Sequence, residues 1–254
     1  MTCNDFLKSY WRHYIMIENE FIKTTEYVDF DVDNYKTFSQ MYLKLILECG
    51  SEIDVVFKEL CIKLGCVFKN KDEKNINKKT KITSTQPNGV DANIHEYILY
   101  IWNHQPAAST NFFNQSVTID SLSINTQVIP WENNDKSKIV PAAPDWWEKY
   151  NLIKHNRIFE DDDNDVTVQK NYKYANLENC LYTLAGLYQL EMYLYYELAN
   201  EANNNQANQL IVPLPSSRIF EITDGVWSNI TFFNQMAFTV NNNGEYILNA
   251  GNAF

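Results

Sequence analysis

The chain has 254 residues, of which 45% are hydrophobic and 14% are aromatic. This amount of apolar side chain can form a core, which excludes a chain that is disordered as a whole. The 21 basic and 32 acidic residues give a net charge of −11. Because binding to nucleic acid or to an anionic membrane depends on many Lys and Arg side chains, that excess of acid excludes such binding through the bulk surface and leaves only a local basic site.

The sequence predicts a soluble, cytoplasmic protein that does not bind membranes. Its first residues carry charges and lack the apolar core of a signal peptide, and no uncharged stretch of about 18 residues occurs. Cys49, Cys61 and Cys180 lie in apolar helical patterns, so we expect buried, reduced thiols there. The absence of Gly-rich phosphate-binding motifs disfavours Rossmann and phosphate-loop folds.

The first half of the chain is predicted to be helical, with one loop and one hairpin. Apolar residues recur every three or four positions over 4–28 and 35–64, which predicts two amphipathic helices. The polar, basic composition around 69–81 is typical of a solvated loop. A third helix is predicted over 91–104, with Asp91 as its N-cap.

Alternating apolar and polar residues then predict two short strands, 116–121 and 124–130, that pair as a hairpin. A helix is predicted over 145–159, begun by a capping box between Asp145 and Glu148 and ended by the acidic run 160–165. A long helix is predicted over 174–201.

The expected fold is mainly α. We predict a single domain, 1–254, built as a bundle of four to five helices. A loop and hairpin insertion occupies about 69–140, and a C-terminal extension of short strands or irregular structure occupies about 210–254.

The helix predicted over 145–159 carries the residues most suited to chemistry. Lys154 and Arg157 can hold a phosphate ester, and His155 can carry a proton. On a helical wheel Tyr150 shares a strip with the two cations, while Asn151 pairs with His155 on the neighbouring strip. Two Trp residues and Tyr150 are expected to anchor the helix. The same cations are also favourable at any helix C-terminus, so an ordinary cluster of ion pairs with the acidic run is the alternative.

Two carboxylates are predicted on inward-facing helix surfaces. Glu52 lies at the edge of the apolar stripe of 35–64, and Glu191 lies in the middle of the stripe of 174–201. A buried carboxylate needs a cationic or hydrogen-bonding partner. We therefore expect Glu52, and with it Glu191, to meet the Lys154–Arg157 segment; the alternative is that these carboxylates reach solvent.

Three segments together resemble divergent, uncharacterised bacterial members of the HEPN superfamily. They are Ser51-Glu52-Ile53-Asp54, then Pro144-x-Trp-Trp-x-x-Tyr150-Asn151-x-x-Lys154-His155-x-Arg157, and Ala175-Asn176-Leu177-x-Asn179. That superfamily consists of helical bundles of toxin–antitoxin, abortive-infection and CRISPR systems, many of which are metal-independent RNases. The resemblance covers mainly 35–66 and 141–200.

The resemblance implies a metal-independent endoribonuclease that needs no cofactor, acts on RNA as a homodimer, and serves as a toxin or phage-defence effector with an unidentified antitoxin or defence partner. His155 would be catalytic, with Lys154 and Arg157 stabilising charge and Glu52 or Asp54 as the acidic partner. Tyr150, Asn151, Asp54 and Glu191 would contribute to binding. In the superfamily an Arg precedes the His, whereas Asn151 and Lys154 stand on that side here. A non-catalytic nucleotide-binding or protein-interaction module is therefore the alternative.

Overall fold

The computed structural model describes residues 1–66, 93–104, 112–120, 125–132, 141–158, 170–202, 212–223, 227, 238–240 and 246–248. These residues are mainly helical and include a small three-stranded antiparallel sheet, which confirms the predicted mainly α class. The basic loop around 69–81 and the acidic run 160–165 lie outside the described residues. No helix in the described ranges is both long enough and apolar enough to cross a bilayer.

The N-terminal helix predicted over 4–28 is present as a chain of consecutive helical segments. They are α1 (Cys3–Phe6), a π-helical turn (Leu7–Trp11), α2 (Arg12–Lys23) and a 3-10 turn (Thr24–Glu26). The Thr2 hydroxyl accepts a hydrogen bond from the Asp5 N–H and caps the first turn.

The next two helices begin where a side chain can cap them. α3 (Gln40–Lys63) starts later than predicted because Ser39 is extended and its Oγ accepts the N–H of Tyr42 at 3.0 Å. α5 (Ile94–Asn103) is capped by Asn93, in a capping box with Glu96, so the predicted cap at Asp91 is wrong.

The last two helices flank the predicted site. α6 (Asp145–His155) has Pro144 at its N-cap with no side-chain cap, so the predicted capping box of Asp145 and Glu148 is wrong. Both acids instead lie in the first turn, where they complement the helix dipole. α7 (Leu177–Ala202) confirms the long helix predicted over 174–201, and Asn176 caps it by accepting the N–H of Asn179 at 3.0 Å.

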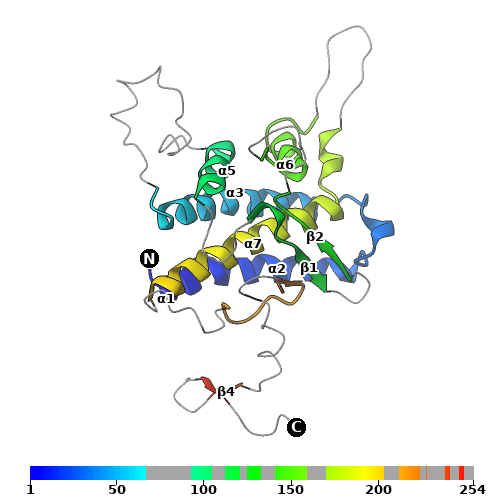
Figure 1. Ribbon diagram of the computed structural model, residues 1–254. Coiled ribbons are helices and arrows are strands. Elements are labelled where there is room, and N and C mark those ends of the chain that lie inside the picture. Colours follow the sequence, from blue (N-terminus) through cyan, green and yellow to red (C-terminus); the bar gives the residue numbers. More distant parts are fainter. Residues whose placement is uncertain are drawn as a thin grey trace, which may run out of the picture.

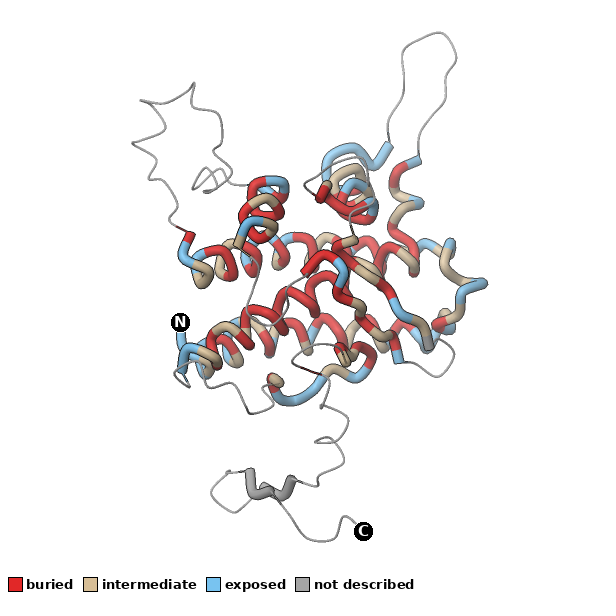
Figure 2. Tube along the Cα trace, viewed as in Figure 1, coloured by how far each residue is buried: buried red, intermediate tan, exposed pale blue. Residues whose placement is uncertain are grey.

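α7 is the central helix of the molecule. It is buried along most of its length, whereas α2 and α3 keep exposed outer faces (Figure 2). α2 and α3 pack against α7, and α5 and α6 lie together on one side of α3 (Figure 1). An amphipathic stripe was visible in the sequence, but burial on nearly all sides follows from the helices that surround α7.

The predicted hairpin is confirmed. β1 (Val117–Asp120) pairs antiparallel with β2 (Asn125–Val128), with Val117 opposite Val128. β3 (Phe220–Glu221), from the C-terminal extension, adds to the other edge of β1. β4 (Phe238–Val240) and β5 (Tyr246–Leu248) form a separate antiparallel pair, as expected for short C-terminal strands. The insertion and the C-terminal extension thus share one sheet.

Close packing at two glycines fixes α6 in place. The Tyr150 ring lies so near Gly50 of α3 that a Cβ there would overlap it, and a Cβ on Gly186 of α7 would come within 2.9 Å of Trp146. Trp146 also donates its indole N–H to the Pro130 carbonyl at 2.6 Å. The glycines allow two large rings to approach helix backbones, so α6 is held against both α3 and α7.

Candidate functional site

The C-terminal end of α6 presents a basic, exposed group on a buried support. Trp146, Trp147 and Tyr150 are 4%, 7% and 3% exposed, which confirms the predicted anchoring of the helix. Lys154 and His155 are exposed one turn later. The Lys154 ammonium lies 5.4 Å from the centre of the Tyr150 ring, a cation–π distance that holds the charge over a fixed ring.

The chain beyond α6 is held by the segment that precedes α7. The Asn171 side chain is buried and donates to the Asn156 carbonyl at 2.6 Å, and the N–H of Tyr172 donates to the Arg157 carbonyl at 3.1 Å. Because α6 ends at His155, Arg157 is not on its helical surface, and the predicted shared strip with Tyr150 and Lys154 does not extend to it. Arg157 is exposed on a backbone that these two hydrogen bonds secure.

Asp54 is the acid of α3 that lies near this group. Burial raises the pKa of the Asp54 carboxyl, and the charges of Lys154 and Lys58 oppose that rise. The resemblance implies either Glu52 or Asp54 as the acidic partner. Asp54 is the one that lies close enough to Lys154 for their charges to interact. Asn151 lies half-buried on α6, one residue after Tyr150.

Glu52 lies elsewhere, so the expected contact between Glu52 and the Lys154–Arg157 segment is wrong. Its Oε2 is 3.4 Å from Nδ1 of His13 on α2, and Nε2 of the same imidazole is 3.2 Å from Oε1 of Glu48. Burial raises the pKa of the Glu52 carboxyl, and the neighbouring His13 opposes that rise. The partner of Glu52 is thus a histidine of α2 and not a cation of α6.

Glu191 is buried without any partner among the described residues. Its side chain is fully buried, and neither carboxyl oxygen has a hydrogen bond. Burial raises the pKa of this carboxyl well above its ordinary value, and the charge of Glu52 raises it further. The inward position was predicted correctly, but the expected cationic partner from α6 is not there. The charge that acts on Glu191 is that of Glu52, which itself pairs with His13 of α2.

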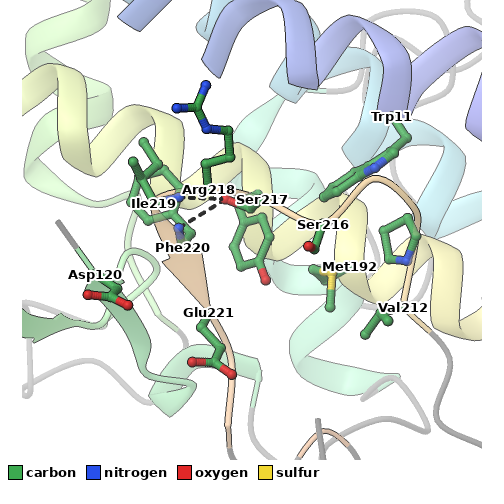
Figure 3. A pocket seen from close by; sticks show the side chains of 12 residues that line it. Trp11, Asp120, Met192, Val212, Ser216, Ser217, Arg218, Ile219, Phe220 and Glu221 are labelled. Atoms are coloured by element: carbon green, nitrogen blue, oxygen red, sulfur yellow. Dashed lines mark hydrogen bonds between the residues drawn. The ribbon is translucent and has the colours of Figure 1, made fainter. Parts of the chain in front are cut away.

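A separate pocket lies where the C-terminal segment crosses α2 and α7 (Figure 3). The segment is fixed by the fully buried Glu18, whose carboxylate accepts hydrogen bonds from the Tyr14 hydroxyl at 3.0 Å, the Arg218 N–H at 3.1 Å and the Ser217 hydroxyl. Asp120 and Glu221 lie together at one end of the pocket. Sequence reasoning missed Glu18, although its place one turn after Tyr14 on the apolar face was a usable signal.

Neither metal nor disulfide chemistry has a visible scaffold in the described ranges. No group of three or more His, Cys, Asp or Glu side chains there is arranged to hold a metal ion. All five cysteines are free thiols, and Cys49, Cys61 and Cys180 are buried, as predicted. The reactive groups at the end of α6 are therefore one imidazole, one ammonium and one guanidinium, with Asp54 beside them.

Comparison of the chain with models of protein families, with curated proteins and with solved structures finds no match.

Proposed function

We propose that the chain is a HEPN-like, metal-independent endoribonuclease whose active site is the exposed end of α6. The observation that carries the proposal is the exposed His155 between exposed Lys154 and Arg157, on a backbone secured by α3, α7 and the segment before α7. An imidazole titrates near neutral pH, and two cations held beside it can bind a phosphodiester. A rigid support keeps such groups within the tolerance that catalysis needs.

The proposed reaction is transesterification within the RNA strand. The ribose 2′-oxygen loses its proton to a base and bonds to the adjacent phosphorus, while the bond from phosphorus to the 5′-oxygen breaks and that oxygen takes up a proton. The products are a 2′,3′-cyclic phosphate and a 5′-hydroxyl. His155 transfers a proton, and Lys154 and Arg157 stabilise the charge that develops on the phosphoryl oxygens.

The proposal includes a HEPN-type arrangement of the bundle and a homodimer. Two copies that face each other at the end of α6 would double the local positive charge, which allows a protein of net charge −11 to bind RNA locally. In this form the protein would act in the cytoplasm as a toxin or a phage-defence effector. The mainly helical architecture and the exposed position of the motif support this assignment.

Three observations favour a second function, a non-catalytic nucleotide-binding module. Lys154 is engaged by the Tyr150 ring and lies near Asp54, and no Arg precedes His155 at the position the superfamily uses. Such a site would bind the phosphate group of a nucleotide without cleaving a phosphodiester bond.

RNA cleavage by the full chain, in buffer with excess chelator, separates the two functions. We expect the wild type to cleave a labelled single-stranded RNA, and His155→Ala to reduce the rate by about 10²–10⁴-fold, as is typical for a positioned acid or base. Arg157→Ala should also reduce the rate, while Lys8→Ala, a charge removed from an exposed site near the N-terminus, should not. Absence of cleavage by clean wild type, with retained RNA binding, would favour the binding module.

A further inference from the structure

A second basic feature lies at the start of α7. It is a pocket of about 470 Å³, within the size range of small-ligand sites. Its main lining residues are Lys36, Phe38, Lys149, Lys173, Tyr174 and Glu178. They come from the segment before α3, from α6, from the 3-10 turn Asn171–Tyr174 and from the start of α7, so distant parts of the chain form the pocket jointly.

The charge of this pocket is opposite to that of the whole chain. Three lysines and one glutamate line it, so its charge is positive, whereas the net charge of the chain is −11. Lys36 pairs with Glu178, and Lys149 pairs with Asp145. Ion pairs at the surface are weak, so an incoming phosphate can bind these ammonium groups in place of the carboxylates. The pocket of Figure 3, with Asp120 and Glu221 in its wall, has no comparable excess of cations.

The pocket also offers an aromatic surface on a fixed backbone. Phe38 is 46% exposed, which is unusual for a large apolar ring, and Tyr174 lies nearby with the Lys149 ammonium 5.8 Å from its ring centre. The backbone on either side of Phe38 is tied to α7: Leu177 donates to Thr37 at 3.0 Å, and Ser39 donates to Ala175 at 3.1 Å. Exposed rings beside ammonium groups are the elements with which proteins bind single-stranded nucleic acid.

The lysines, and not the helix N-terminus, supply the hydrogen-bond donors. The first N–H groups of α7 are already used: that of Leu177 by Thr37, that of Glu178 by Tyr35, and that of Asn179 by the Asn176 side chain. The helix dipole still favours an anion here, but no free backbone donor among these three remains for it.

The pocket adjoins the end of α6. Lys173 and Tyr174 directly follow Asn171 and Tyr172, the two residues that hold the backbone at Asn156 and Arg157. The segment that lines the pocket therefore also contacts the backbone that follows His155.

We propose that this pocket holds one nucleotide of a single-stranded RNA, with the base against Phe38 and the phosphate among Lys36, Lys149 and Lys173, and that the strand continues to His155. The continuation to His155 rests on the proposed function. The occupancy of the pocket does not, because binding is measured without cleavage.

Fluorescence anisotropy with a labelled, 2′-O-methylated oligoribonucleotide tests the pocket, since that strand cannot undergo the proposed cleavage. We expect Phe38→Ala to weaken binding by about 5- to 150-fold, the usual range for loss of one base–aromatic stack. Lys173→Ala should reduce the slope of log affinity against log salt by about 0.7, the value for one phosphate contact to a single strand. Far-UV circular dichroism and thermal melting verify that both variants are folded.

Lys8→Ala is the matched control, because it removes one exposed positive charge near Phe6, which packs on Tyr195 far along α7 from the pocket. Equal binding by Phe38→Ala, Lys173→Ala and Lys8→Ala would overturn the inference. So would a free nucleoside monophosphate that competes as strongly as the oligonucleotide, because the occupant would then be a mononucleotide. If both pocket variants weaken binding but the wild type never cleaves RNA, the proposed function is contradicted and the pocket is not. If the wild type cleaves RNA but both pocket variants bind as the wild type does, the pocket is contradicted and the proposed function is not.

Discussion

Glu52 and Glu191 show what the sequence predicts about a single residue: whether it faces the interior, but not which residues it meets there. The sequence correctly predicts that Glu191 faces the interior, because it lies between Leu187 and Tyr195 on one helical face. It does not identify the neighbours, since His13 meets Glu52 only through the packing of α2 on α3. Asp54 and Glu52 are two residues apart and face different neighbours, and only the folded arrangement decides which one approaches α6.

The titration of Glu191 makes a prediction about stability. Its pKa is raised in the folded chain, so folding favours the protonated form. The contribution of Glu191 to stability is therefore complete below the ordinary carboxyl pKa of about 4.3 and is lost as the pH rises toward the folded-state pKa. Relative to Glu191→Gln, which does not titrate, the wild type should lose up to about 1.4 kcal/mol per pH unit over that range.

Urea unfolding of both proteins at a series of pH values from acidic to mildly alkaline measures this difference. If the unfolding free energy changes with pH in the same way in the wild type and in Glu191→Gln, then folding does not favour the protonated form of Glu191. Glu52→Gln serves as a companion variant, because Glu52 contributes to the raised pKa.

At the scale of elements, the position of α6 depends on two glycine contacts. Gly50→Ala places a methyl group against the Tyr150 ring. We expect a net loss of about 1–2 kcal/mol, because overpacking costs about 1–3 kcal/mol and the better helix propensity of Ala returns up to about 1 kcal/mol. The end of α6 should also shift, and under the proposed function this shift lowers the rate of RNA cleavage.

Thermal melting of Gly50→Ala, Tyr150→Leu and the double variant forms a cycle that isolates the contact. The Ala substitution should cost less in the Tyr150→Leu background. Ser51→Ala, at the exposed neighbouring position on α3, should change stability by less than about 0.5 kcal/mol. If Gly50→Ala costs the same with or without the tyrosine ring, the proposed packing of α6 is incorrect.

The C-terminal segment is an element that depends on one buried side chain. Glu18→Ala leaves the Arg218 N–H and the Tyr14 and Ser217 hydroxyls without their acceptor. We expect a loss of about 1–3 kcal/mol, the penalty for buried groups left unsatisfied. Hydrogen exchange at the Arg218 amide should accelerate in this variant, while Glu20→Ala, which removes a surface ion pair with Lys44, should leave it unchanged. Unaltered exchange in Glu18→Ala would contradict the anchoring.

Helices and strands with a strong local pattern can be predicted from the sequence. Features that depend on contacts with distant segments cannot. α3 and α7 follow from a long apolar period, and the β1–β2 hairpin follows from alternation and a short connection. The addition of β3 to β1 joins residues about one hundred positions apart, so no local pattern could show it. The start of α6 was misjudged because an acidic residue in the first turn looks the same in sequence as a cap.

Across the whole molecule, charge is distributed unevenly. The overall excess of acid makes binding through the bulk surface unfavourable, whereas lysines and one arginine gather near the end of α6 and the start of α7. The sequence located the group at Lys154, His155 and Arg157 because these residues are contiguous. It missed the pocket at Lys36, Phe38 and Lys173, whose members come from separate segments.

The central claim is that His155 takes part in breaking RNA through its own 2′-hydroxyl. The most direct measurement is mass spectrometry of the 3′ ends released from a defined single-stranded RNA by the full chain in excess chelator. We expect 2′,3′-cyclic phosphate ends with wild type and Lys8→Ala, and almost none with folded His155→Ala. Intact RNA with wild type, or cyclic phosphate ends at an equal rate with His155→Ala, would contradict it.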